Sequence, residues 1–250
     1  MRRYIFCLFS LMYSLLAGCT PDLQDSAHLQ VRFLTQLPPS PSQADLDQVT
    51  LPSSEGITFY SAQNPNVERQ PFSYITAITS EAREYKDSVN LLPQANYPVL
   101  ASNIDFGLKQ SETGVYAYNR YKGRADALIR WYGNTRVAYL ALINPYHDQT
   151  DSLQEQDLEL LRNSVDRLQI KGIKNIILLS QYPASVSPDL LQAIQGIDVV
   201  ISTGEHSQTQ LAKNACMAQF SQNRTDNLAL VFDARGHLTQ CRFHPSGSAT

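Results

Sequence analysis

Two polar loops that follow buried strands contain side chains suited to chemistry. Gln181 lies just beyond the predicted strand Asn175–Leu179. Glu205 and His206 lie beyond the next predicted strand, Ile197–Ile201. Open α/β sheets bind ligands at the carboxyl ends of their strands, and imidazole and carboxylate groups are common ligands of zinc. These loops are therefore the first candidates for a metal or substrate site.

A second polar pair, His147-Asp148, follows the predicted strand that ends at Ile143. If the three loops share one sheet edge, His147, Asp148, Glu205 and His206 could form a mononuclear metal site. The alternative is a polar loop in an empty cleft. We favour it, because ligand types without demonstrated geometry are weak support for a site. A single imidazole in a loop is more often solvated or hydrogen-bonded than metal-bound.

Nucleophilic catalysis has less support in the sequence. Ser180 and Ser207 do not lie in a Gly-x-Ser-x-Gly elbow. A run between residues 116 and 124 could instead grip an anionic or sugar ligand, since it combines Tyr116, Tyr118 and Tyr121 with Arg120, Lys122 and Arg124. The favoured alternative is an amphipathic loop or edge strand in which an arginine stacks on a tyrosine.

The N-terminus has the features of an export signal. Arg2 and Arg3 precede the apolar run Tyr4–Leu16 and the sequence Leu16-Ala17-Gly18-Cys19, which resembles the lipobox of bacterial lipoproteins. The resemblance implies that residues 1–18 are a signal peptide and that Cys19 is the lipidated first residue of the mature protein. An ordinary signal peptide or a transmembrane anchor is the alternative, but the run is shorter than the roughly 20 residues that span a bilayer.

A lipid anchor at Cys19 implies an extracytoplasmic protein held at a membrane. Thr20 rather than Asp follows the cysteine, which favours the outer over the inner membrane in a Gram-negative cell. We expect residues 19–30 to be the lipidated cysteine and a polar tether, residues 31–245 one domain, and residues 246–250 a tail. The formal charge of −3 shows no basic excess, so a nucleic-acid partner is not expected.

Four cysteines are present, of which Cys7 leaves with the signal peptide and Cys19 takes lipid. Cys216 and Cys241 remain, and in an oxidising compartment a disulfide between them is expected. The alternative is a pair of zinc ligands. It is weaker, because no cysteine or histidine lies at ligand spacing from either residue.

Apolar runs alternate with amphipathic segments, which predicts an α/β fold. Helices are predicted at Ser73–Val89, Ser152–Ile170 and Pro188–Gln195, and a Ser152-x-x-Glu155 capping box is expected to open the second. Further strands are predicted at Val31–Thr35, Gly56–Tyr60, Tyr97–Ile104, Ala127–Tyr132, Arg136–Ile143, Asn227–Phe232 and His237–Phe243. The most continuous apolar strands should be covered by helices on both faces.

The motifs in this order resemble the 5'-nucleotidase branch of the calcineurin-like metallophosphatases. That family has strands ending in Ser-His and a Gly-Ile-Asp-Val run leading to Gly-Gly-His-Ser-His. The corresponding segments here are Ser180-Gln181, Gly196–Val199 and Ser202–His206, and further matches are Tyr97–Ile104, Ala127–Ile143, Ser152–Gly172 and Asp226–Gln240. The resemblance implies a metallophosphatase-like mixed β-sandwich flanked by helices.

Active members of that family hold two divalent metals, which clamp phosphoryl oxygens and generate hydroxide. The family's Asp-x-His position falls on Leu37-Pro38-Pro39, which offers no ligand atom. Gln181 replaces the strand-end histidine, and Gly204 replaces the first histidine of the last pair. His206 keeps the second position, whereas Ser61-Ala62 stands at the best-aligned position of an Asn-His pair and no Gly-Asp turn occurs.

One retained ligand does not hold a dinuclear centre, so the sequence predicts no cofactor and a lost hydrolase activity. The remaining role would be binding or structural, with an envelope protein as a possible partner. The alternative is a metal-dependent phosphoesterase or 5'-nucleotidase with a remodelled site. In that alternative the metal ligands would come from His206, Glu205 and His147.

Overall fold

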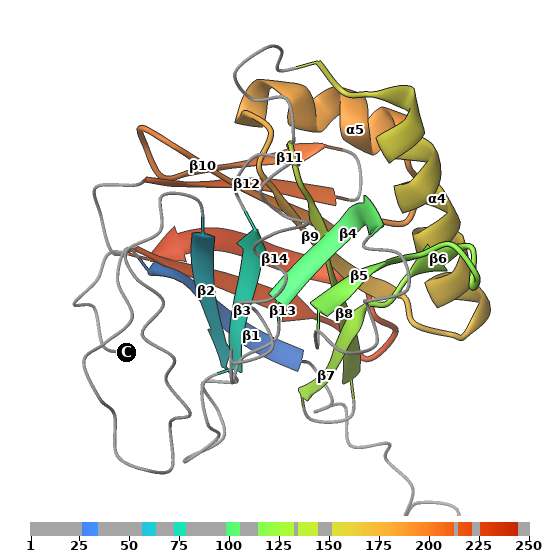
Figure 1. Ribbon diagram of the computed structural model, residues 1–250. Coiled ribbons are helices and arrows are strands. Elements are labelled where there is room, and N and C mark those ends of the chain that lie inside the picture. The colour runs from blue at the N-terminus through green and yellow to red at the C-terminus, as the bar shows by residue number, and fades with distance from the viewer. Residues whose placement is uncertain are drawn as a thin grey trace, which may run out of the picture.

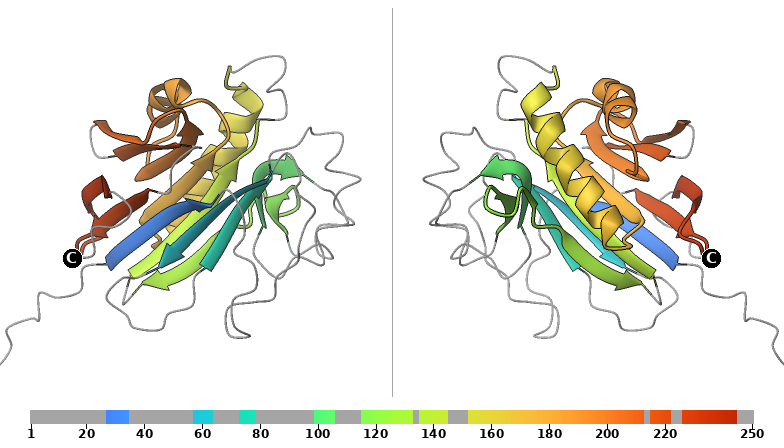
Figure 2. Two further views of the ribbon diagram at one scale, coloured as in Figure 1. Left: turned by 90° about the vertical axis from the view of Figure 1, so that its left-hand side faces the viewer. Right: turned by 90° about the vertical axis from the view of Figure 1, so that its right-hand side faces the viewer.

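The structure is a computed structural model that describes residues 27–34, 57–63, 73–78, 99–105, 115–132, 135–144, 152–212, 215–221 and 226–244. These residues form two stacked sheets with helices on one side (Figures 1 and 2). The eight-stranded sheet runs in the order β14 (Leu238–His244), β13 (Asn227–Phe232), β1 (Ala27–Leu34), β2 (Ile57–Gln63), β3 (Ser73–Ile78), β4 (Val99–Asp105), β5 (Val115–Asn119) and β6 (Arg124–Ala125). Within the described ranges, no helix is both long and apolar enough to span a membrane.

The six-stranded sheet runs in the order β11 (Gln208–Ala212), β12 (Ala215–Ser221), β10 (Val199–Gly204), β9 (Asn175–Ser180), β8 (Thr135–Leu142) and β7 (Leu128–Tyr132). Its four central strands are parallel, and β7 and β11 pair with it in antiparallel orientation. All six residues of β9 are buried, as is typical of a parallel strand inside an α/β sheet.

The two faces of this sheet pack into separate cores. Along β9, Ile176 and Leu178 face the helices, and Ile177 and Leu179 face the eight-stranded sheet. The expected α/β fold and mixed β-sandwich are therefore confirmed. The expectation of helices on both faces is wrong, because the second sheet covers one of them (Figure 2). Continuous apolar strands show that both faces are buried, but they do not show what buries them.

Helix α4 (Glu155–Ile170) packs on the outer face through residues spaced by three and four. Its buried residues include Leu158, Leu161, Val165 and Leu168, and each buried leucine side chain contributes roughly 1.5–3 kcal/mol through the hydrophobic effect. The expected capping box is wrong: the N-cap is Gln154, and its side chain forms no capping bond. The helix ends before Gly172, whose φ of 73° suits glycine. The second helix, α5 (Ser187–Ala193), follows the short 3-10 turn η3 (Ala184–Val186).

Two further expectations need correction. Strand β1 begins at Ala27, so residues 27–30 belong to the sheet and not to the tether. The helix expected from Ser73 is wrong for residues 73–78, which form β3 and pair with β2 from Ile57↔Ile78 to Ala62↔Ser73. The rest of that predicted helix lies outside the described residues. Strand pairing with β2 decided the outcome, because SYITAI contains β-branched residues as well as a helical spacing.

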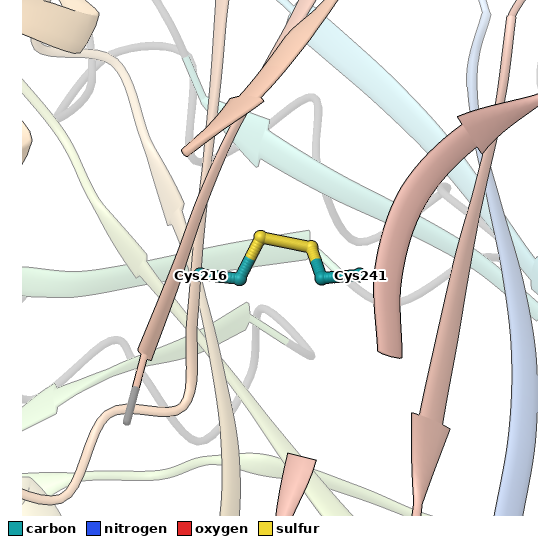
Figure 3. Close-up of a disulfide and its surroundings, with 2 residues drawn as sticks. All are labelled: Cys216 and Cys241. Atoms are coloured by element: carbon teal, nitrogen blue, oxygen red, sulfur yellow. A yellow bond between two sulfur atoms is a disulfide. The ribbon is translucent and has the colours of Figure 1, made fainter. Parts of the chain in front are cut away.

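A disulfide joins the two sheets (Figure 3). Cys216 lies on β12 in the six-stranded sheet, and Cys241 lies on β14 at the edge of the eight-stranded sheet. The Cα atoms are 6.4 Å apart, and Cys216 is fully buried in the core between the sheets. Phe220 and Phe243 pack edge to face across the same interface, with ring centroids 4.8 Å apart. These contacts fix the C-terminal hairpin against the parallel sheet.

Candidate functional site

The parallel strands bring the loops that follow them to one edge of the sheet. The register pairs Leu142 with Ser180 across β8 and β9, and Ile201 with Leu179 across β10 and β9. Gln181 follows β9, and Gly204 ends β10. The structure thus places these two positions at the carboxyl edge, as the sequence predicts for a ligand site.

Side chains of β4 complete the hydrogen bonding of β8 near this edge. β7 pairs with β8 only as far as Tyr139. Beyond that point, the Ala141 N–H donates to Ser102 Oγ at 2.9 Å, and the Ile143 N–H donates to Asn103 Oδ1 at 2.8 Å. Asn103 Nδ2 also donates to the Ile143 carbonyl at 2.9 Å. These buried polar groups are therefore satisfied within the fold and hold the two sheets together.

Gln181 extends the β8–β9 ladder with its side chain. Its N–H donates to the Leu142 carbonyl at 3.0 Å, and its Oε1 accepts the Asn144 N–H at 3.2 Å. Its Nε2 is buried and has no hydrogen-bond partner among the described residues. The amide oxygen is thus already used for structure. The amide nitrogen is a donor without a lone pair available for a metal.

A buried carboxyl group lies next to this edge, and sequence reasoning missed it. Asp157 is in the first turn of α4, and its Oδ2 accepts a long bond of 3.4 Å from Tyr182 Oη. Burial raises the pKa of Asp157, while hydrogen bonds from Asn103 and Tyr182 oppose that rise. The sequence contains a signal for this residue, because position 157 lies four residues before Leu161 and so puts a charged side chain on the apolar face of the predicted helix. Its partners indicate a role in positioning α4 against β4 and β9.

A histidine at Gly204, where the resemblance places one, would displace the side chain of Gln219. A Cβ atom added at Gly204 would overlap the side-chain amide of Gln219 on β12. Gln219 Oε1 accepts a bond of 3.1 Å from Gln208 Nε2 on β11. The space beside Gly204 is therefore filled by a glutamine that belongs to a hydrogen-bonded pair, and a larger residue requires Gln219 to move.

Glu205 and His206 lie in the bend between β10 and β11, and both are exposed. The Glu205 carbonyl accepts a bond from Ser221 Oγ, and Ser207 Oγ accepts one from the Ser221 N–H, both at 2.9 Å. These bonds hold the backbone of the bend. In the parts of the chain that the structure describes, no three His, Cys, Asp or Glu side chains are grouped as metal ligands. His147, Asp148 and Leu37–Pro39 lie outside those parts, so the favoured polar loop and the alternative mononuclear site both stay untested there.

The segment Ser61-Ala62 was expected to follow a strand and instead lies within one. β2 continues to Gln63, and Ser61 pairs with Arg32 on β1 and Tyr74 on β3. The expectation that these residues lie in a loop after the strand is therefore wrong, and their equivalence with the Asn-His pair stays a prediction.

The tyrosine and arginine run forms the β5–β6 hairpin and its turn. The Arg120 Nε donates to Asp105 Oδ2 at 2.7 Å instead of stacking on a tyrosine. Lys122 Nζ lies 2.9 Å from Asp126 Oδ2. Tyr116 and Arg124 line a groove against α4. The run is thus an edge hairpin, which the favoured alternative predicts, but Arg120 forms an ion pair with Asp105 in place of the expected stacking.

A partly buried carboxyl group lies at the opposite, amino edge of the sheet. Asp198 precedes β10, and its Oδ2 accepts the Ile176 N–H at 2.8 Å. Burial raises the pKa of Asp198 to about 7, opposed by this backbone bond and by the charge of His237. The Asp198 carbonyl also accepts the Cys216 N–H at 2.8 Å. Through its carboxyl and backbone carbonyl groups, Asp198 thus joins the starts of β9, β10 and β12, which is a structural role.

Comparison with solved structures shows which known proteins share this two-sheet architecture. A 5'-nucleotidase precursor from Thermus thermophilus matches with a TM-score of 0.50 and 16% identity, covering 67% of this chain. The chain has a 5'-nucleotidase-like metallophosphatase fold. The NAD nucleotidase of Haemophilus influenzae matches with a TM-score of 0.48 and 15% identity over 68% of this chain. The chain spans 38% of the first protein's length and 35% of the second's. Neither a protein-family model nor a curated protein sequence matches it.

The metallophosphatase fold implies a dinuclear metal centre at the carboxyl edge, and the described residues there do not fit one. Gln181 offers a single amide oxygen that already accepts the Asn144 N–H. Gly204 has no side chain, and Gln219 fills the adjoining space. Two metals need several convergent N, O or S ligands, whereas these two positions supply only the amide oxygen of Gln181, which the Asn144 N–H already engages.

Proposed function

We propose that this protein is a lipid-anchored envelope protein in which a 5'-nucleotidase-like metallophosphatase fold has lost catalysis and serves a binding or structural role. The observation that carries the proposal is the use of the Gln181 side chain as a structural group. Its Oε1 completes the hydrogen bonding of β8 at the place where the family has a metal-binding histidine. Gln219 beside Gly204 supports the same conclusion from the neighbouring strand.

A hydrolysis assay tests the loss of catalysis. The purified chain is incubated with manganese or zinc and a panel of nucleoside monophosphates and bis-(p-nitrophenyl) phosphate. We expect a rate no different from that of the metal and substrate without protein. Metal-dependent turnover that follows the protein through successive purification steps would overturn the proposal.

The second candidate function is a metal-dependent phosphoesterase with a remodelled site. It is favoured by one observation: Glu205 and His206 are exposed at the carboxyl edge, where a ligand could reach both. If such an enzyme exists here, His206→Ala abolishes its activity and Arg235→Gln, an exposed change in the distant β13–β14 turn, leaves it intact. Any measured activity that is unchanged in His206→Ala excludes this candidate.

The anchor is proposed from the Leu16-Ala17-Gly18-Cys19 sequence, and its test is independent of catalysis. Mass spectrometry of the mature protein should find an N-terminal Cys19 carrying acyl chains. Cys19→Ala should remove the lipid and release the protein from membranes. We also propose an envelope protein as partner, which co-purification in mild detergent would detect. An unmodified Cys19 in membrane-extracted protein would refute the anchor alone.

A further inference from the structure

A groove far from the carboxyl edge lies between α4 and the strands β5, β6 and β7. Its volume is about 400 Å³, and its walls include Tyr116 on β5, Arg124 on β6, Ile129 on β7, and Arg167, Leu168 and Lys171 at the end of α4. Ligand pockets have volumes of roughly 300–1,000 Å³, so the groove is large enough for a small molecule. Lys171 lies on the connection that enters β9 at its amino end, and the groove is therefore separate from the site discussed above.

Three cations of this groove have no ionic partner among the described residues. Arg124, Arg167 and Lys171 form no salt bridge within those stretches. The acidic residue on the wall, Asp126, is already paired with Lys122 Nζ at distances of 2.9 and 3.0 Å. The groove is thus positive, although the chain as a whole has a formal charge of −3.

The helix dipole and a ligand of the groove are two possible reasons for the three cations, and their positions distinguish them. Arg167 and Lys171 lie at the C-terminal end of α4, where cations offset the partial negative charge of the helix dipole. Arg124 lies on β6 and has no such role, yet it lines the same groove. The helix dipole therefore accounts for two of the cations but not for Arg124, which lines the same groove.

The groove also has an apolar side and a rigid frame. Tyr116 and the exposed Ile129 provide apolar surface, and the floor includes the buried Leu168. The Ala125 N–H donates to Ser164 Oγ at 2.8 Å, and Ser164 Oγ donates to the Leu160 carbonyl at 2.8 Å. These bonds fix β6 against α4, so the two elements that carry the cations are held in place relative to each other.

We propose that this groove binds a small organic anion: an apolar or aromatic body that packs on Tyr116 and Ile129, with an acidic group held by Arg124, Arg167 and Lys171. Guanidinium groups bind carboxylate, sulfonate and phosphate oxygens through paired hydrogen bonds. The apolar wall selects against inorganic anions, and the cations select against neutral aromatic compounds. This inference goes beyond the proposed function and does not depend on it.

The test uses 1-naphthalenesulfonate, which a phosphoesterase cannot hydrolyse, in isothermal titration calorimetry with the purified chain. We expect saturable binding that weakens as salt is raised. Sulfate alone and 2-naphthol alone should each bind at least roughly tenfold more weakly, because each lacks one half of the recognition. Failure of the sulfonate to bind saturably overturns the proposal.

A double variant locates the site. Arg124→Gln with Arg167→Gln should weaken the sulfonate roughly tenfold or more, because two charge-assisted hydrogen-bonding groups are lost. The control Arg235→Gln with Arg242→Gln removes two cations outside the groove and should leave the affinity unchanged. Circular dichroism and the urea midpoint verify that both variants fold. Equal weakening in both variants, or association with anionic vesicles while the soluble sulfonate fails to bind, would also overturn the proposal.

Discussion

Replacing Cys216 and Cys241 with alanine removes the disulfide that joins the two sheets in the described part of the chain. The bond joins residues separated by 25 positions. Loop-closure entropy for that separation amounts to about 12 cal/mol/K, or about 3.5 kcal/mol of unfolding free energy at 25 °C. That is a large share of the roughly 5–15 kcal/mol that stabilises a typical domain.

Packing losses at the two alanines are smaller than this entropic effect. Cys216 is fully buried against the core between the sheets, while Cys241 is only partly buried. Each substitution removes one sulfur atom and keeps the Cβ atom, so most surrounding contacts remain. The paired alanine variant therefore isolates the link better than a single substitution, which would leave a free thiol.

Urea unfolding followed by circular dichroism measures the effect. The variant should lose about 3.5 kcal/mol of unfolding free energy, and wild-type protein with its disulfide fully reduced should match the variant. A thiol assay confirms that reduction is complete. A loss below about 1 kcal/mol, outside the usual range for a native disulfide, would refute the reasoning. A loss of about 3.5 kcal/mol on removal of the disulfide would fit a protein that folds in an oxidising, extracytoplasmic compartment.

Three further predictions concern the Asp198 carboxyl group, the packing of α4 and the turn at Gly196. The pKa of Asp198 is raised to about 7 in the folded state. The protonated carboxyl group therefore stabilises the fold fully below the pKa that Asp198 has in the unfolded chain, and this contribution is lost as the pH rises through about 7. The wild-type unfolding free energy should therefore fall by an amount of the order of 4 kcal/mol between pH 4 and 8 in urea titrations, and Asp198→Asn should remove this fall. Parallel pH profiles for the two proteins would contradict this. Leu161 is fully buried on the inner face of α4. Leu161→Ala should cost about 2–5 kcal/mol of unfolding free energy in the same assay, and a smaller loss argues against this packing. Gly196→Ala should cost about 1–3 kcal/mol, because φ is 93° and the new Cβ would meet Gln169; an unchanged urea midpoint contradicts it.

The sequence predicted the parallel core well because its signals are local. The residues of β9 and the helix face at Leu158, Leu161, Val165 and Leu168 can be read from apolar runs and spacing alone. The cover on the second face of the sheet could not be read in this way. It consists of strands that are far apart in the chain, such as β1 and β13, which pair with each other in space.

The site was predicted only at the level of the sheet edge. Gln181 and Gly204 were placed there from strand direction, and the structure agrees. The hydrogen bond from Asn144 to the Gln181 side chain and the filling of the space beside Gly204 by Gln219 could not be predicted. Gln219 belongs to β12, a strand that the sequence analysis did not identify, and its contact depends on strand pairing across the sheet.

Metal content of the purified chain tests the central claim most directly. The chain is equilibrated with manganese, zinc or iron, passed through a desalting column, and analysed by inductively coupled plasma mass spectrometry. The account predicts no stoichiometric metal, because Gln181 and Gly204 do not supply the ligands of a dinuclear centre. About two equivalents of metal retained per chain, as in a two-metal hydrolase, would contradict it.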